Sequence, residues 1–318
     1  MIDREEELVT VFGGGGFIGR YVCELLLQSG VRVRVVQRDP RQAHMLQPLA
    51  QIGQLGIEAA DVTRPASVRN AVRGASAVIN LAGAFGRAMQ SVHVEGARNI
   101  AEAVRDHGAG ALVHLSAIGA DPASPSAYGR SKSAGEQALR GAFPAATIIR
   151  PSLVFGPDDK LTNRFAAMAR LPLLPVLAAN TKFQPVYVRD LARAIAAAAL
   201  DRPAYSGKTF EIGGPQRLSM VDLHREILGL TGQKPELVRL PDAVGSLVSR
   251  FGWLPAAPLD RDQWLMLQSD NVPAAGAPGL EAFGIKPTPL AAVGPEWLGR
   301  FQPGGKFAGR RIHLTPAA

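Results

Sequence analysis

A glycine-rich segment between an apolar run and a helical pattern constrains the fold of this chain more than any other feature. Residues 8–12 (LVTVF) predict a strand, and four glycines follow at positions 13–16. From residue 17 onward the apolar side chains recur at helical spacing. In a dinucleotide-binding fold, glycines at such a junction form the tight turn and let the backbone approach a pyrophosphate, which binds the first amides of the helix. The candidate residues are Gly13, Gly16, Phe17, Ile18 and Gly19.

An ordinary glycine-rich surface turn is the alternative, but alternating strands and helices downstream favour the dinucleotide site. Further strands are predicted at 31–38, 57–61, 75–83, 111–116 and 145–150, and helices at 66–73 and 92–106. This order is typical of an α/β fold with a doubly wound parallel sheet, a Rossmann domain. We expect a Rossmann core over residues 1–158 and a smaller, loop-rich α/β region over 159–318. The chain is expected to return to the core around 183–215.

Composition limits the class of protein. The chain has 318 residues, 47% of them hydrophobic and 19% charged, which fits a globular protein with a large core. No apolar run is long enough to span a membrane, and the acidic start MIDREEE resembles neither a secretory signal nor a transit peptide, so we expect a cytoplasmic location. The single cysteine, Cys23, is predicted to lie in the core of the first helix. One cysteine excludes a disulfide framework, and no metal site is predicted.

The net charge of +8 indicates an anionic ligand or partner. A phosphate-bearing ligand, a nucleic acid, an acidic protein and an anionic membrane surface would each fit. The basic residues are scattered and no aromatic-rich nucleic-acid motif is present, so we expect no nucleic-acid partner. Peripheral contact with the cytoplasmic face of the inner membrane stays open.

The end of the second predicted strand bears on the choice between NAD and NADP. An acidic residue there binds the ribose 2′-hydroxyl of NAD, whereas an arginine accommodates the 2′-phosphate of NADP. The chain has Gln37 at this position and Arg38 next, and Asp39 precedes a proline as a capping or turn residue. Arg38 therefore favours NADP(H). An ordinary exposed arginine is the alternative, and the nearby Arg41 could share or replace the role.

Three further segments follow predicted strands, at the sheet edge where ligands bind. The Asp61 carboxylate, followed by Val62, either accepts a hydrogen bond from the adenine amino group or acts as a cap or turn residue. Small residues after the fourth strand permit a close approach of the cofactor. After the sixth strand the chain is expected to pass over the nicotinamide. The residues assigned to these last two segments are Leu81, Ala82, Gly83, Pro151 and Leu153.

A serine, a tyrosine and a lysine form the candidate catalytic set. Ser116 ends the fifth strand, and Tyr128 and Lys132 lie four residues apart on one face of a predicted helix. The ammonium is expected to lower the pKa of the phenol from about 10, which makes Tyr128 a candidate general acid/base. Lys132 would also hold the nicotinamide ribose, and Ser116 would orient a carbonyl or alcohol. His114 is expected to be a hydrogen-bonded core or edge residue.

With these motifs the chain resembles the short-chain dehydrogenase/reductase superfamily, in its extended or atypical branch. The resemblance is carried by GGGGFIG (13–19), DV (61–62), NLAG (80–83), HLSAIGA (114–120), YGRSK (128–132), RPSLVFGP (150–157) and QPVYVRDLARA (184–194). It implies a Rossmann domain with a smaller C-terminal substrate region. Phe12 stands where the extended branch usually has threonine, a departure that places the chain among the atypical members.

Within that superfamily the chain is similar to the NAD(P)-binding accessory subunits of respiratory complex I (NADH:ubiquinone oxidoreductase) and their bacterial relatives. VFGGGGFIGRY, SVHVEGARNIAEA and TIIRPSLVFGPDDKLTNRFA carry this similarity. It implies a bound NADPH with a largely structural role, and partners in the hydrophilic arm of complex I. The intact Ser116, Tyr128 and Lys132 keep open an active NADPH-dependent reductase or epimerase of a small carbonyl or sugar-like substrate. A sensor of the NADPH/NADP⁺ ratio is a third hypothesis.

The C-terminal region carries several further expectations. The apolar segment 171–177 is interpreted as a buried connector, with a lipid or partner contact as the alternative. Asp190 is predicted to cap a helix at 191–200, and Arg150 to pair with a carboxylate. The three tryptophans are expected to act as lid or interface anchors, and they are Trp253, Trp264 and Trp297. The basic end is interpreted as a solvated tail or a docking element, and it comprises Lys306, Arg310, Arg311 and His313.

Overall fold

A seven-stranded sheet with helices on both faces forms the centre of the protein. The computed structural model describes residues 6–251 and 259–305. Its main sheet has the strand order β11-β6-β5-β4-β1-β2-β3, and every neighbouring pair is parallel. The strands are β1 (Leu8–Phe12), β2 (Arg32–Gln37), β3 (Leu55–Ala59), β4 (Ala77–Asn80), β5 (Ala111–Leu115), β6 (Thr147–Pro151) and β11 (Thr209–Ile212). The predicted doubly wound parallel sheet is confirmed.

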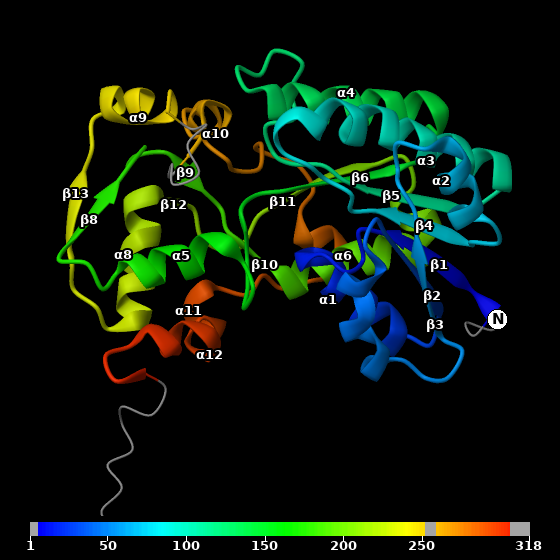
Figure 1. Cartoon of the computed structure of the whole chain (residues 1–318), viewed down its shortest axis with the longest axis horizontal. Coiled ribbons are helices and arrows are strands. Elements are labelled where there is room, and N and C mark those ends of the chain that lie inside the picture. Colours follow the sequence, from blue (N-terminus) through cyan, green and yellow to red (C-terminus); the bar gives the residue numbers. More distant parts are fainter. Residues whose placement is uncertain (1–5, 252–258, 306–318) are drawn as a thin grey trace, which may run out of the picture.

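Two helical layers enclose this sheet, as Figure 1 shows. One layer contains α1 (Phe17–Gln28) and α6 (Val188–Leu200), and the other contains α2 (Pro65–Val72), α3 (Gly96–His107) and α4 (Ala127–Ala142). Alternate residues of β1 point to opposite layers, so Val11 packs on the α1/α6 side and Phe12 on the α2/α3 side. The central strands β1, β4 and β5 are covered on both faces and are largely apolar, as is typical of parallel sheets, whereas the edge strand β3 is mostly exposed.

A smaller lobe stands beside the carboxyl ends of these strands and forms the left half of Figure 1. Its helices are α5 (Lys160–Met168), α8 (Met220–Thr231), α9 (Asp242–Ser249), α10 (Arg261–Met266), α11 (Leu290–Val293) and α12 (Pro295–Leu298). Its strands are β8 (Leu173–Val176), β9 (Lys182–Phe183), β12 (Leu218–Ser219) and β13 (Glu236–Arg239), paired as β8 with β13 and β9 with β12. A short pair, β7 (Val154–Phe155) with β10 (Val186–Tyr187), lies between the lobes, and α7 (Arg202–Tyr205) precedes β11.

The chain returns from the small lobe to the main sheet through β10, α6 and β11. Strand β11 pairs with β6 as the seventh strand. Trp297 of α12 is buried and its ring stacks on Tyr187 and Phe155, so this tryptophan anchors the C-terminal region on the body of the protein. The division of the chain into domains at residue 158 stays a prediction.

Several predicted boundaries are wrong by a few residues. The third strand ends at Ala59, so Asp61 lies in the turn after it, and the fourth strand is confined to Ala77–Asn80. A single-turn π-helix, Gln90–Glu95, precedes α3, and a 3₁₀-helix, Pro40–Leu49, follows β2. The apolar pattern locates a strand or helix but not its last residue, which is set by the backbone hydrogen bonds of the folded chain.

Asp190 is not the cap of its helix. The helix begins at Val188 with Tyr187 at the cap position, and Asp190 lies in the first turn with its side chain buried. The carboxylate accepts a hydrogen bond from the amide of Thr288 (2.7 Å) and pairs with Arg193. The negative charge still lies at the positive end of the helix dipole, but its role is to hold the C-terminal segment.

Segment 171–177 contains strand β8 and is not simply a buried connector. Residues of β8 alternate between faces, so Leu174 and Val176 are buried and Leu173 is half exposed. Leu171, which precedes the strand, is half exposed as well. Trp264 is buried, while Trp253 and the basic residues Lys306, Arg310, Arg311 and His313 lie outside the described residues. Within residues 6–251 and 259–305, no helix is long and apolar enough to cross a membrane.

Candidate functional site

The glycine loop has the geometry that a bound dinucleotide requires. Gly13 adopts a left-handed backbone (φ +80°), and its amide donates to the carbonyl of Val36 (2.9 Å). A Cβ on Gly14 would lie 2.9 Å from Cys23 Sγ, and a Cβ on Gly19 would overlap the Gly13 carbonyl oxygen. Helix α1 begins after Gly16, and no side chain in the described part of the chain caps it, so its first amides are left for another acceptor. The predicted cradle for a pyrophosphate fits this arrangement.

Phe17 and Ile18 open helix α1 and are partly buried. The Phe17 ring meets the Tyr21 ring edge-on at 6.2 Å. A Cβ on Gly156 would contact the Phe17 ring at 3.4 Å, so the glycine loop lies against the segment that leaves β6 and β7. Two predicted parts of the site, far apart in the sequence, therefore meet here.

The structure distinguishes Arg38 from Arg41 at the end of β2. Arg41 forms an ion pair with Asp39 (2.9 Å), whose carboxylate also caps the following 3₁₀-helix, as predicted. Arg38 is exposed and, among the described residues, makes no hydrogen bond or ion pair, although its charge helps to lower the pKa of Asp61. Arg38 is therefore the guanidinium available to a phosphate.

Asp61 acts as a turn residue. Its Oδ1 accepts hydrogen bonds from the amide of Thr63 (2.9 Å) and from the Thr63 hydroxyl (2.8 Å), which are the main causes of its lowered pKa. Val62 is buried and packs against Gly96, where a Cβ would lie 2.8 Å from the valine Cγ2. The turn interpretation is thus confirmed, while a bond from Asp61 to adenine stays a prediction.

The segment after β4 lies over the glycine loop. A Cβ on Gly13 would approach the carbonyl oxygen of Leu81 to 3.1 Å. Asn80 Oδ1 accepts from the amide of Ala82 (3.0 Å) and fixes this turn, and Gly83 beyond it is exposed. A close approach of the cofactor to Leu81, Ala82 and Gly83 stays a prediction.

Pro151 is the last residue of β6 rather than part of the segment after it, and both are tied to their neighbours by backbone hydrogen bonds. The carbonyl of Pro151 accepts from the amide of Ile118 (3.1 Å), and the carbonyl of Leu153 accepts from the amide of Val186 (2.8 Å). Pro151 is buried and Leu153 partly buried. Their contact with a nicotinamide stays a prediction.

Ser116, Tyr128 and Lys132 follow or face the carboxyl end of β5. Ser116 is buried, and its Oγ has no partner among the described residues. Lys132 is buried and donates from Nζ to the carbonyl of Leu115 (3.1 Å). The same Nζ lies 5.8 Å from the centroid of the Tyr128 ring, one helical turn earlier on α4. The prediction that Tyr128 and Lys132 lie on one face of a helix is confirmed.

The expected effect of the ammonium on Tyr128 is wrong. Burial raises the pKa of Tyr128 to about 12. Burial also lowers the pKa of Lys132 to about 8, a shift that Glu136 on the next turn opposes. Desolvation of the phenolate causes the shift of Tyr128, while the Lys132 Nζ donates its hydrogen bond to the carbonyl of Leu115.

Two residues around Tyr128 escape prediction from the sequence. Phe85, which is 63% exposed, stacks on the Tyr128 ring with centroids 5.1 Å apart. His93, in the π-turn, accepts from the amide of Ala84 (3.0 Å) at Nε2 and contacts Ser131 Oγ (2.9 Å) at Nδ1. Because Nε2 accepts, Nδ1 carries the ring proton and donates it to Ser131 Oγ. The histidine thus joins the loop of Phe85 to helix α4, and no local sequence signal marks it.

His114 is a core residue, but only one of its nitrogens is hydrogen-bonded. Asn80 Nδ2 donates to His114 Nδ1 (3.1 Å), which places the ring proton on Nε2, and Nε2 has no partner among the described residues. Burial, with Lys132 nearby, lowers the pKa of both His114 and His93 to about 3. Both imidazoles are therefore neutral near pH 7.

Comparison with known proteins gives a consistent picture. Residues 9–213 match the NAD dependent epimerase/dehydratase family. The chain is 35% identical over 302 residues to NADH dehydrogenase (ubiquinone) 1 alpha subcomplex subunit 9, mitochondrial, of Mus musculus, covering 92% of this chain and 80% of the relative. It is 33% identical over 263 residues to a ceramide reductase of Caulobacter vibrioides, covering 79% and 80%.

Solved structures share the fold at low identity. An NADPH-dependent quinone oxidoreductase from Escherichia coli, complexed with NADPH, superimposes with a TM-score of 0.72 at 19% identity, covering 89% of this chain and 97% of the other. A UDP-glucose 4-epimerase of Thermus thermophilus, in complex with NAD, superimposes with a TM-score of 0.66 at 20% identity, covering 92% and 98%.

Proposed function

This chain belongs to the NAD dependent epimerase/dehydratase family, and from that premise we propose that it binds NADP(H) as an accessory, largely structural subunit of respiratory complex I. The observation that carries the proposal is the 35% identity to the mitochondrial complex I subunit over 92% of this chain. The family match ends at residue 213, so a similarity of this length extends well into the small lobe. A chain that shared only the cofactor-binding fold would not need to resemble that subunit in the small lobe.

The choice of NADP(H) rests on the contrast between Arg38 and Arg41. Arg41 is paired with Asp39, whereas Arg38 has no ion-pair partner among the described residues and stands at the end of β2. A planar guanidinium with free donors binds a phosphate in two-point fashion. Gly13, Gly16 and the first amides of α1 would hold the pyrophosphate, and Lys132 the nicotinamide ribose. If the protein catalyses a reduction, bound NADPH would supply the hydride to the substrate carbonyl.

Attachment to the hydrophilic arm of complex I, at the cytoplasmic face of the membrane, belongs to the same proposal. The net charge of +8 suits an anionic surface. In the small lobe, Leu171 and Leu173 present exposed apolar side chains that suit a contact with lipid or with a partner protein.

A reductase is the second candidate, and it is favoured by the buried Ser116 hydroxyl, which has no hydrogen-bond partner within residues 6–251 and 259–305. A buried hydroxyl without a partner costs stability, and a substrate carbonyl would satisfy it. Tyr128, with a pKa raised to about 12, stays protonated at neutral pH and could donate a proton to a reduced carbonyl. The exposed Phe85 ring beside it suits an apolar substrate, and the similarity to a ceramide reductase points the same way.

One experiment separates the two candidates. Membranes from the source organism are solubilised gently, and the chain is followed by immunoblot through a native gel against complex I activity. Co-migration, with NADPH released on denaturation but not exchanged by added labelled NADPH within minutes, is expected for the accessory role. A chain that migrates alone and oxidises NADPH with an added carbonyl would refute it.

A further inference from the structure

Helix α4, which carries Tyr128 and Lys132, is capped by a carboxylate from the far end of the chain. Asp262 Oδ1 accepts from the amide of Ala127 (2.5 Å), and its Oδ2 accepts from the amide of Tyr128 (3.0 Å), across 134 residues of sequence. The local cap, Ser126, accepts only from the third amide, that of Gly129 (2.9 Å). The first two amides of the helix therefore depend on Asp262.

The carboxylate is held by its own short helix, independently of α4. Asp260 and Gln263 form a reciprocal capping box at the start of α10, the helix in which Asp262 lies. Trp264, two residues further on, is buried and packs so closely on Gly245 of α9 that a Cβ there would overlap the indole. A fixed carboxylate needs little reorganisation to bind two amides.

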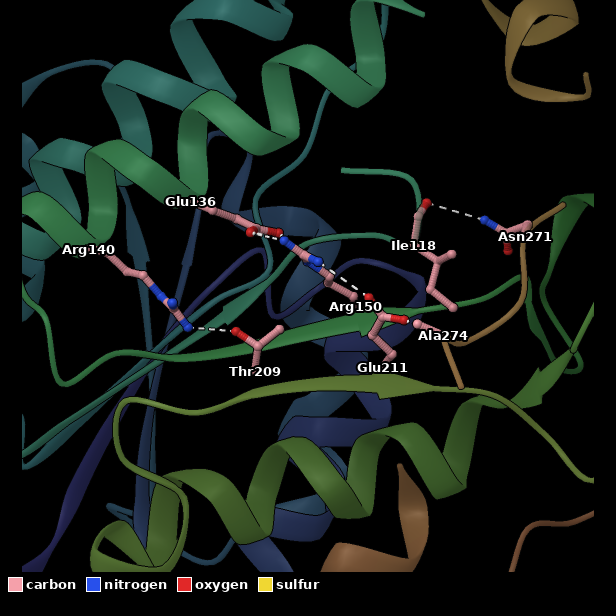
Figure 2. A network of polar contacts seen from close by, with 8 residues as sticks. All are labelled: Ile118, Glu136, Arg140, Arg150, Thr209, Glu211, Asn271 and Ala274. Carbon is pink, nitrogen blue, oxygen red and sulfur yellow. Dashed lines mark hydrogen bonds and ion pairs between the residues drawn. The ribbon is translucent and has the colours of Figure 1, made fainter. Parts of the chain in front are cut away.

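The same C-terminal segment also contacts the loops that carry the rest of the site. Asn271 donates from Nδ2 to the carbonyl of Ile118 (3.3 Å), two residues after Ser116, and accepts a hydrogen bond from the Ser152 hydroxyl (2.8 Å). The amide of Ala274 donates to Glu211 (2.8 Å) at the end of β11. Figure 2 shows Asn271 beside Ile118, and Ala274 beside Glu211. One segment, residues 260–274, thus touches the exits of β5, β6 and β11 as well as α4.

We propose that Asp262 is a positioning residue for Tyr128, holding the first turn of α4 so that Tyr128 and Lys132 face the dinucleotide. The first turn of a helix frays most readily because its amides have no partner within the helix. Tyr128 is the second residue of that turn, and a carboxylate there also interacts favourably with the helix dipole. The functional part of this inference, the effect of Asp262 on cofactor binding, rests on the proposed NADP(H) site. The structural part, the ordering of the first turn of α4, does not.

The structural part is tested without nucleotide. Hydrogen–deuterium exchange of a peptide covering residues 126–132 is compared between the wild type, Asp262→Ala and Asp262→Asn. We expect at least tenfold faster exchange in Asp262→Ala and an intermediate rate in Asp262→Asn, which keeps one acceptor oxygen. Equal rates in the wild type and Asp262→Ala would overturn the proposal, whether or not the protein binds NADPH.

The functional part is tested by NADPH affinity, measured from cofactor fluorescence. Asp222→Ala is the matched control, because Asp222 also lies in the first turn of a helix, α8, and is bonded to Ser219 and Arg225 away from the site. We expect Asp262→Ala to weaken NADPH binding about tenfold, Asp262→Asn to recover part of the loss, and Asp222→Ala to stay within twofold.

An equal loss in Asp262→Ala and the Asp222→Ala control would reduce Asp262 to a stabilising residue and overturn the positioning role. Absence of NADPH binding by the wild type would instead refute the proposed function, and the exchange rates would still decide whether Asp262 orders α4.

Discussion

The Nζ of Lys132 lies 5.8 Å from the centroid of the Tyr128 ring, yet the pKa of Tyr128 is raised to about 12. The two side chains share one face of α4, but the ammonium donates its hydrogen bond to Leu115. Tyr128 is therefore protonated at neutral pH, and the raised pKa makes its phenol a weaker acid than that of a free tyrosine.

Tyr128→Phe tests the reductase hypothesis. The change removes the proton donor and keeps the ring that stacks on Phe85. If the protein is a reductase, we expect turnover to fall by roughly 10²–10⁴-fold, the usual contribution of a positioned general acid, with NADPH affinity nearly unchanged. Steady-state rates and a fluorescence titration measure the two quantities. Unchanged turnover in Tyr128→Phe would show that Tyr128 is not the proton donor.

Arg38→Ala tests the preference for NADP(H). Loss of a charge-assisted contact to the 2′-phosphate should cost about 1.5–3 kcal/mol, which is roughly a 10- to 100-fold weaker affinity for NADPH, with little effect on NADH. Arg41→Ala is the control, because Arg41 is already paired with Asp39. Isothermal titration with both nucleotides measures the ratio. A larger loss of NADPH affinity in Arg41→Ala than in Arg38→Ala would indicate that Arg41, and not Arg38, contacts the 2′-phosphate.

Gly19→Ala tests the tight packing of the glycine loop. The new methyl group would overlap the Gly13 carbonyl, so we expect destabilisation by about 1–3 kcal/mol together with loss of nucleotide binding. Gly229→Ala is the matched control within α8, where a Cβ meets nothing within 4 Å. Its expected effect is a gain of about 0.5–1 kcal/mol. Chemical denaturation gives both free energies of unfolding. An unchanged stability in Gly19→Ala would contradict the close packing of Gly19 on the Gly13 carbonyl.

His93→Gln tests the pH dependence of stability. The pKa of His93 is about 3 in the folded protein and about 6.5 when unfolded, so the unfolded chain binds the extra proton between these values. The free energy of unfolding should therefore be highest above pH 6.5 and fall as the pH drops toward 3, by up to about 1.4 kcal/mol per pH unit for this residue. Urea denaturation between pH 7.5 and 4.5 should show a shallower slope in the variant. An unchanged slope would mean that His93 does not stay neutral.

Arg150→Met tests the charge cluster drawn in Figure 2. Arg150 pairs with Glu136 on α4 (2.6 Å) and with Glu211 on β11 (3.3 Å), as the sequence predicted for an arginine at the sheet end. Its removal leaves two largely buried carboxylates unpaired, for which we expect destabilisation of about 3 kcal/mol. Arg225→Met, which breaks an exposed pair with Asp222, should cost about 1 kcal/mol or less. Equal effects in thermal denaturation would contradict a structural role for the cluster.

Local sequence patterns predicted the fold and the framework of the site. The strand–glycine–helix segment could be identified because its main requirements are local: apolar residues for the strand, a left-handed backbone at Gly13 and no side chain at Gly19. The resemblance to the short-chain dehydrogenase/reductase superfamily is confirmed by the match over residues 9–213. Strand ends and the cap near Asp190 were misplaced, because neighbouring strands and distant segments determine them.

The tertiary structure decided what surrounds the reactive groups. The sign of the Tyr128 pKa shift depends on burial, and spacing along a helix carries no information about burial. Asp262 lies 134 residues from the Tyr128 amide that it caps, and the rings of Phe85 and His93 contact Tyr128 from the segment between β4 and α3. The sequence by itself determined that this chain builds a dinucleotide fold with a serine, a tyrosine and a lysine at its edge. Only packing between distant segments decided how those side chains are held and charged, because hydrogen bonds and desolvation act through space.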